Sequence, residues 1–287
     1  SLGRLWALDA VPKDAGLLFL PAHNIGMSVS LYLAPLLELL GVRADVCLHR
    51  KTTRYRQLYT APDLFGERYG GGMEPAMREW FLNRLPPRGA VTAGRKVYFS
   101  RSRLGPEVGR FCNEPLLEGL LEKDGYEIIA PERLSLEAQV TVMQDAEALL
   151  FAESSALHLY GLVARKGQRA GVIQRRSTVP TLIIGQFRDV PIDLCVIDAI
   201  EDILWPPLRA VNRSIAILDF DRLRDELSAQ GFLSPGAEWR GPAVSEISSS
   251  LHLGLDVSGT LILDAERRDW LRAYKQRKNL RKRTATE

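Results

Sequence analysis

The chain has 287 residues, of which 46% are hydrophobic and 25% are charged, and its formal net charge at pH 7 is +3. This length allows two domains, the composition is that of a soluble globular protein, and the small net charge gives no indication of nucleic-acid binding. No apolar run reaches the roughly 20 residues that cross a bilayer, and the three cysteines are too far apart for a zinc site. We therefore expect a cytoplasmic protein with reduced thiols, no bound metal and no cofactor.

The first 88 residues alternate between helix and strand patterns. Helices are predicted over Leu2–Leu8, Ser30–Leu40 and Glu74–Leu85, and strands over Gly16–Leu20 and Asp45–His49. This order predicts a parallel crossover. His23 follows the first strand, where parallel sheets collect ligand groups, although a histidine in such a place is more often structural. Because the chain opens inside a helix without an initiator methionine, we expect an upstream portion to be missing.

Residues 89–205 repeat the alternation after a proline- and glycine-rich linker. The predicted strands are Val97–Phe99, Tyr126–Ala130, Ala148–Ala152 and Arg169–Gln174. The predicted helices begin near Asn113 and cover Leu136–Ala146 and Ala156–Ala164. Strands that alternate with helices predict a parallel sheet whose C-terminal edge holds a ligand.

Three arginines, Arg101, Arg103 and Arg110, follow the first strand of this second unit. Guanidinium groups next to a helix N-terminus are suited to a diphosphate, because they donate planar, bidentate hydrogen bonds to its oxygens. Arginines in such loops also pair with nearby acids, so a structural role stays open. Asn113 and Glu114 come next, and a role as helix caps stays open for them as well.

The turn Glu153-Ser154-Ser155 connects a predicted strand to a helix that carries His158. Its small residues would let backbone N–H groups approach a ligand. The GxSxG pattern of a hydrolase elbow and the GxxxxGK[ST] pattern of a P-loop are both absent from the sequence.

The last 82 residues, 206–287, begin with a strand and helix over residues 213–233, followed by a predicted loop over Ser234–Ser250 and a strand over Gly259–Leu263. A final helix from Ala265 carries nine basic residues between Arg267 and Arg283. Such a helix could dock on anionic membrane or nucleic acid, and a solvated terminal helix is the competing interpretation.

The order of short motifs FSR, NE, GY-x-II, LSLEAQ and SALH resembles the glycosyltransferase family 61 domain, in particular its bacterial branch of capsular polysaccharide biosynthesis proteins. The likeness covers residues 1–205. It implies an α/β fold of GT-B type, in which two Rossmann-like parallel-sheet halves face a cleft. Residues 1–88 would form the acceptor-side half, 89–205 the nucleotide-sugar-binding half, and 206–287 a C-terminal extension.

The resemblance implies an inverting, metal-independent transfer of a hexosyl or pentosyl group to a glycan or glycolipid acceptor of a bacterial surface polysaccharide. The arginines would neutralise the donor diphosphate, and the remaining residues would line the nucleotide and sugar pocket or position the donor. The implied donor-binding residues are Arg101, Arg103, Arg110, Asn113, Glu114, Gln139, Glu153, Ser154, Ser155 and His158.

Two departures from the family pattern stand out. Ser154 occupies the place of a glycine in the turn before SALH, which restricts close approach of the backbone. The usual location of the catalytic base precedes Ser1, and among the residues present His23 is the best substitute. A non-catalytic relative that binds a glycan or a partner through the basic helix is the alternative, with peripheral contact to anionic membrane through residues 267–283. Nucleic-acid binding is a third, less favoured interpretation.

Overall fold

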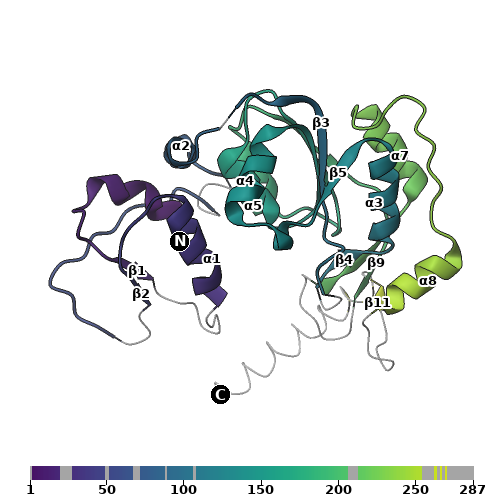
Figure 1. Ribbon diagram of the computed structural model, residues 1–287. Coiled ribbons are helices and arrows are strands. Elements are labelled where there is room, and N and C mark those ends of the chain that lie inside the picture. Colours follow the sequence, from purple (N-terminus) through teal and green to yellow (C-terminus); the bar gives the residue numbers. More distant parts are fainter. Residues whose placement is uncertain are drawn as a thin grey trace, which may run out of the picture.

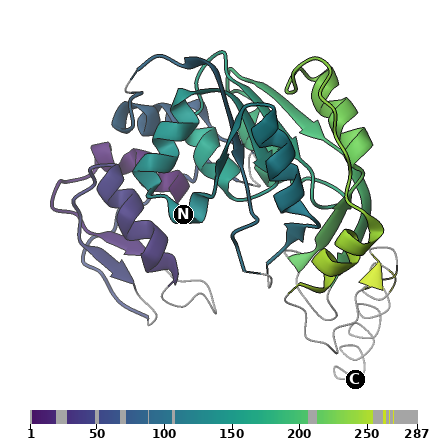
Figure 2. The same cartoon turned by 45° about the vertical axis from the view of Figure 1, so that its right-hand side comes forward.

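The computed structural model describes residues 2–19, 28–48, 52–66, 72–87, 89–105, 108–205, 213–253, 262–263, 266 and 269. His23 and the basic segment 267–283, apart from Asp269, lie outside the described residues. Figures 1 and 2 show an N-terminal unit, residues 2–87, beside a larger body built on a central sheet. The described residues contain no helix long and apolar enough to cross a membrane.

The central sheet has five parallel strands in the order β5-β3-β6-β7-β8. They are β3 (Thr92–Phe99), β5 (Tyr126–Ile129), β6 (Ala146–Ala152), β7 (Arg169–Ile173) and β8 (Asp193–Ile197). Numbered along the chain, this order is 2-1-3-4-5, a doubly wound arrangement in which the direction of winding reverses between β3 and β6. Ligands of such sheets bind outside the C-terminal ends of the strands at that point.

Helices cover both faces of this sheet because its strands are apolar on both sides. Alternate residues point to opposite faces, so Phe99 and Phe151 stack in one core while Tyr98 and Leu150 lie in the other. The first core lies under α4 (Leu136–Asp145) and α5 (Ala156–Val163). The second lies under α3 (Glu114–Lys123) and α7 (Phe220–Ala229). The predicted parallel α/β sheet is confirmed.

Ser135 and Asn113 occupy the N-terminal cap positions of α4 and α3, the two helices that begin next to the sheet edge. Ser135 caps α4 by accepting a hydrogen bond from the backbone N–H of Ala138 at 3.1 Å, after the short 3-10 turn η3 (Pro131–Arg133). Asn113 occupies the cap position of α3 with a φ of 57°, in the left-handed region that asparagine tolerates. Its side chain makes no capping hydrogen bond in α3 and instead donates to the carbonyl of Glu246.

The N-terminal unit contains η1 (Leu2–Ala10), β1 (Leu17–Phe19), α1 (Ser28–Leu39), β2 (Val46–Leu48) and α2 (Pro75–Arg84). β1 and β2 pair in parallel, as the crossover pattern predicts, and η1 is a 3-10 helix rather than an α-helix. One apolar core is shared between α1 and α2 on one side and α4 and α5 on the other. The described part of this unit holds a two-stranded sheet, so the two-half GT-B arrangement stays a prediction.

A second, four-stranded sheet in the order β11-β9-β10-β4 lies beside the first. Its strands are β4 (Arg110–Phe111), β9 (Ile200–Trp205), β10 (Ile215–Leu218) and β11 (Ile262–Leu263). β9 and β10 pair across residue 205, where we predicted a domain boundary, and the boundaries themselves stay predictions. The weakly patterned stretch before β9 forms α6 (Thr181–Ile184), the 3-10 turn η4 (Gly185–Phe187) and β8.

The predicted loop Ser234–Ser250 is wrong in its second part, which forms α8 (Val244–His252). Serine has a low helix propensity, and tertiary contacts supply what the local sequence lacks. The Glu246 carboxylate accepts a hydrogen bond from the backbone N–H of Ala243 at 2.6 Å and closes the first turn. At the other end, the guanidinium of Arg110 donates to the final carbonyls of the helix.

Candidate functional site at the sheet edge

Three arginines meet at the C-terminal edge of the central sheet, close to the point where the strand order reverses. Arg101 follows β3 after one residue, and Arg175 and Arg176 follow β7. Their charges act on one another and on Glu153, which directly follows β6. We call Arg101, Arg175 and Arg176 the arginine cluster.

Glu153 is the fully buried counter-charge of this cluster. Its Oε2 accepts hydrogen bonds from the backbone N–H groups of Arg175 at 3.0 Å and Arg176 at 3.2 Å. Its Oε1 forms an ion pair with the guanidinium of Arg176. The carboxylate therefore ties the end of β6 to the end of β7 and holds a cation in front of the sheet.

Arg175 is almost fully buried, and its Nη1 donates to the hydroxyl of Ser214 at 2.8 Å, just before β10. Burial lowers the pKa of Arg175 to about 10, and the positive charges of Arg101 and Arg176 act in the same direction. Within the described chain its Nε has no hydrogen-bond partner. A buried cation with an unsatisfied donor beside two other cations favours an anionic ligand.

Hydrogen bonds hold both the backbone and the guanidinium of Arg101. Its backbone N–H donates to Oε1 of Glu114 at 2.8 Å, and its Nε and Nη2 donate to the carbonyl of Gly109 at 3.1 and 2.9 Å. Burial lowers the pKa of the Arg101 guanidinium, while the negative charges of Glu114 and Glu153 oppose that shift. The side chain is thus preorganised and half-buried.

Two buried carboxyl groups of α3, Glu114 and Glu118, support the segment that carries Arg101. Oε1 of Glu114 accepts from the Tyr98 hydroxyl at 2.9 Å, and the Ser100 hydroxyl shares its single proton between Glu114 Oε1, at 3.2 Å, and Glu118. Oε2 of Glu114 is buried without a hydrogen-bond partner in the described chain. Burial raises the pKa of Glu114, and the adjacent Glu118 adds to the shift.

The other two predicted arginines lie differently. Arg103 is exposed in the turn after β3. Arg110 lies in β4, and its Nη2 donates to the carbonyls of Ser250 at 3.2 Å and Leu253 at 2.9 Å. A cation at the C-terminal end of a helix interacts favourably with its free carbonyls and dipole. The structure thus gives the Arg110 side chain a partner in α8.

Asn113 also holds α8. Its backbone N–H donates to the Ser250 hydroxyl at 2.8 Å, and its Nδ2 donates to the carbonyl of Glu246 at 3.1 Å. Gln139 has a comparable local contact, since its Nε2 donates to the carbonyl of Pro131 at 2.8 Å and stabilises the turn before α4. Both residues lie near the sheet edge with their amide groups engaged by the protein.

Ser154 and Ser155 form the turn between β6 and α5, with Ser155 exposed. His158, on the first turn of α5, faces Oε1 of Gln186 through Nδ1 at 3.2 Å. The ring of Phe65 meets its imidazole edge-on, with 5.8 Å between the ring centroids. His158 therefore lies where the N-terminal unit contacts the body that holds the arginine cluster.

Arg175, Arg176 and Glu118 are not among the residues predicted from the sequence. The signal for the two arginines was present, because IQRRS places them immediately after a buried strand, as FSR places Arg101. Glu118 lay inside a helix with nothing to distinguish it from a solvated acid. Its burial follows from the contacts of α3 with Ser100 and Ser102.

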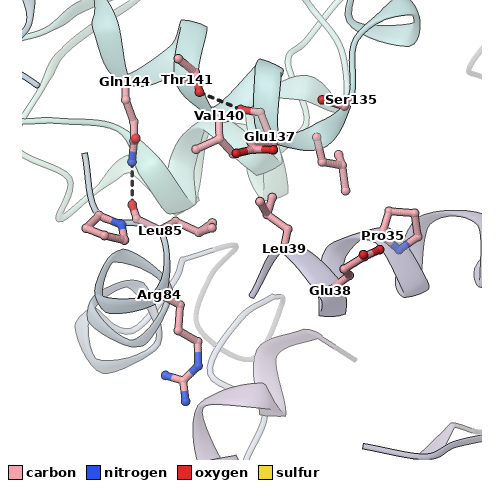
Figure 3. Close-up of a pocket in the computed structure, with 12 residues that line it drawn as sticks. Pro35, Glu38, Leu39, Arg84, Leu85, Ser135, Glu137, Val140, Thr141 and Gln144 are labelled. Carbon is pink, nitrogen blue, oxygen red and sulfur yellow. Dashed lines mark hydrogen bonds between the residues drawn. The ribbon is translucent and has the colours of Figure 1, made fainter. Parts of the chain in front are cut away.

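A groove of about 620 Å³ lies away from the arginine cluster, between α1, α2 and α4. Figure 3 shows Leu39 and Val140 along its walls, with Glu38 and Arg84 among the polar side chains. Nε2 of Gln144 donates to the carbonyl of Leu85 at 2.8 Å and joins two of these helices. The groove marks the junction of the N-terminal unit with the central body.

Among the described residues, no three His, Cys, Asp or Glu side chains gather as a metal site would require. Comparison with protein families matches residues 6–169 to the model described as Glycosyltransferase 61. This range includes Arg101, Glu114, Glu153 and His158 and ends at the start of β7, just before Arg175. No curated protein matches the chain.

Proposed function

The chain belongs to glycosyltransferase family 61 and is a glycosyltransferase, and we propose that it binds the diphosphate of a nucleotide-sugar donor at the arginine cluster. The observation that carries this proposal is the gathering of Arg101, Arg175 and Arg176 around Glu153, where the strand order reverses. Doubly wound sheets hold nucleotides at that place, and three guanidinium groups match the charge of a diphosphate.

Arg176 is the member best placed to contact the donor directly. Its side chain is 19% exposed, whereas the paired Glu153 carboxylate is fully buried. Glu153 keeps two backbone N–H donors when Arg176 turns away, so the carboxylate does not lose all its partners on ligand binding. Arg101 and Arg175 then form the fixed part of the anion site, and Arg176 the adjustable part.

The reaction we propose is a single displacement with inversion at the anomeric carbon. The acceptor hydroxyl oxygen forms the new bond to that carbon while the bond from the carbon to the donor diphosphate breaks. The electron pair of the broken bond leaves on the nucleoside diphosphate, and guanidinium groups that are in place beforehand stabilise this charge as it develops. Cationic side chains would take the part that a metal ion plays in other glycosyltransferases.

The proton of the acceptor hydroxyl must pass to a general base on the acceptor side. We propose His23 for this role, because it follows β1 in the N-terminal unit, and it lies outside the described residues. We also propose that the acceptor is a glycan or glycolipid of a bacterial surface polysaccharide. The transfer would take place in the cytoplasm, and the enzyme would have a fold of GT-B type.

Calorimetry with a panel of nucleoside diphosphates and nucleotide sugars tests this function. We expect at least one nucleoside diphosphate to bind, with its nucleotide sugar supporting transfer to an acceptor glycan. Proton NMR of the product should show the anomeric configuration opposite to that of the donor. Absence of heat with every nucleotide would contradict the proposal and favour a non-catalytic relative.

A further inference from the structure

The segment Thr52–Thr60, which we call the 52–60 strap, presents an unusual surface. All nine of its residues are exposed. Leu58 is 64% exposed, Tyr59 47% and Tyr55 40%, so three of the seven large apolar side chains that are exposed in the described chain lie within five residues. Isolated exposed apolar side chains are common, but such a local group indicates a binding surface.

The C-terminal end of the strap and the two residues that follow it are held to η1 by hydrogen bonds. Nη1 of Arg4 donates to the Thr60 hydroxyl at 3.1 Å and to the carbonyl of Ala61 at 2.8 Å. Nε1 of Trp6 donates to the carbonyl of Pro62 at 3.2 Å. In Figure 1 the described part of the connection from β2 to α2, residues 52–66, loops outward on the side of the N-terminal unit that is remote from the central sheet. The protein thus holds an apolar and aromatic segment outward.

The charged residues of the strap are all positive. Arg54 and Arg56 flank Tyr55, and the segment contains no aspartate or glutamate. Arginine next to tyrosine and leucine is a combination that suits contact with an anionic lipid surface. The guanidinium groups face lipid phosphates, tyrosine lies at headgroup level, and leucine enters the acyl boundary.

We propose that the 52–60 strap docks the protein on an anionic lipid surface. This inference is separate from the arginine cluster at the sheet edge, so lipid docking and nucleotide binding can fail independently. A glycan partner fits the strap less well. A sugar could stack on the rings of Tyr55 and Tyr59, but it would leave Leu58, the most exposed apolar residue, and the two arginines without a matching partner.

Sedimentation of the full chain with vesicles of phosphatidylglycerol and phosphatidylcholine, compared with phosphatidylcholine alone, tests the proposal. The wild type should partition onto anionic vesicles and only weakly onto neutral ones. Arg54→Glu/Arg56→Glu should lower the partition coefficient tenfold or more, since each arginine near the surface contributes roughly a fivefold factor. Arg188→Glu/Arg240→Glu changes the net charge equally at two exposed positions elsewhere and is the matched control.

A second pair of variants tests the apolar part. Leu58→Ser/Tyr59→Ser should lower partitioning severalfold in 0.5 M salt, where the apolar contact contributes more, and Val244→Ser, at a position 84% exposed on α8, should not. Equal losses in the strap variants and their controls would overturn the proposal and assign binding to net charge or to residues 267–283. If the strap variants bind vesicles like the wild type but have a raised KM for the acceptor glycan, the proposal is overturned and the strap is a glycan-binding surface.

Discussion

The Glu153 carboxylate pairs with the guanidinium of Arg176 and also accepts the backbone N–H of the same residue at 3.2 Å. Side chain and main chain of Arg176 are therefore both fixed by one fully buried anion. This relationship sets the resting state of the arginine cluster, because Glu153 is the carboxylate that its three members share.

Glu153→Gln should destabilise the protein, because it removes the buried carboxylate that pairs with Arg176 and whose charge also acts on Arg101 and Arg175. Removing one partner of a buried ion pair costs about 3–5 kcal/mol. A saturating nucleoside diphosphate should raise the melting temperature of the variant more than that of the wild type, since the ligand restores negative charge. Thermal unfolding with and without nucleotide measures both effects. Glu132→Gln, at an exposed position, is the control, and equal ligand shifts in Glu153→Gln and the wild type would contradict this role.

Glu114→Gln should change the pH dependence of stability. Burial raises the pKa of Glu114 above its usual 4.5 in the folded state, so the folded protein holds this proton to higher pH than the unfolded chain. Its contribution to stability is therefore largest at low pH and is lost as pH rises through the raised pKa. Urea unfolding at several pH values should show the wild type losing stability relative to Glu114→Gln as pH increases from 4.5.

Glu122→Gln, on the exposed side of the same helix, should leave that pH profile unchanged. Parallel profiles for the wild type and Glu114→Gln would show that Glu114 does not titrate differently in the folded protein.

Arg110→Ala should loosen α8, because it removes the cation that accompanies the final carbonyls of that helix. We expect faster hydrogen exchange over residues 244–252 and a loss of about 1–3 kcal/mol in the free energy of unfolding. Nucleotide affinity should stay within about threefold of wild type. A tenfold loss of affinity with α8 exchange unchanged would instead place Arg110 in the donor site, as its position near Arg101 in the sequence suggested.

The central sheet could be predicted from the sequence, because its strands are short apolar runs that alternate with helix patterns. Residues Val97–Phe99 and Ala148–Ala152 all lie within observed strands. The helix α8 could not be predicted, since Ser248, Ser249 and Ser250 give a loop-like pattern and one stabilising partner, Arg110, is 140 residues from Ser250.

The sequence predicts an anion site at this sheet edge, which stays a prediction, and the structure adds Arg175 and Arg176 to the residues that gather there. The rule that ligand groups follow the strands of a parallel sheet identified Arg101 and Glu153, and the same rule applied to β7 would have identified Arg175 and Arg176. Proximity in sequence grouped Arg110 with Arg101, but β4 directs the Arg110 side chain toward α8. Only the folded structure decides which side chains of one sequence cluster share a space.

We propose above that the arginine cluster binds the diphosphate of the donor. Calorimetry of Arg176→Ala with the preferred nucleoside diphosphate and with the corresponding nucleoside, beside Arg188→Ala as the control, tests it most directly. Removing a charged hydrogen-bond donor to phosphate should raise the Kd of the diphosphate about 10- to 100-fold and leave nucleoside binding unchanged. Equal diphosphate affinity in Arg176→Ala and Arg188→Ala would contradict the claim.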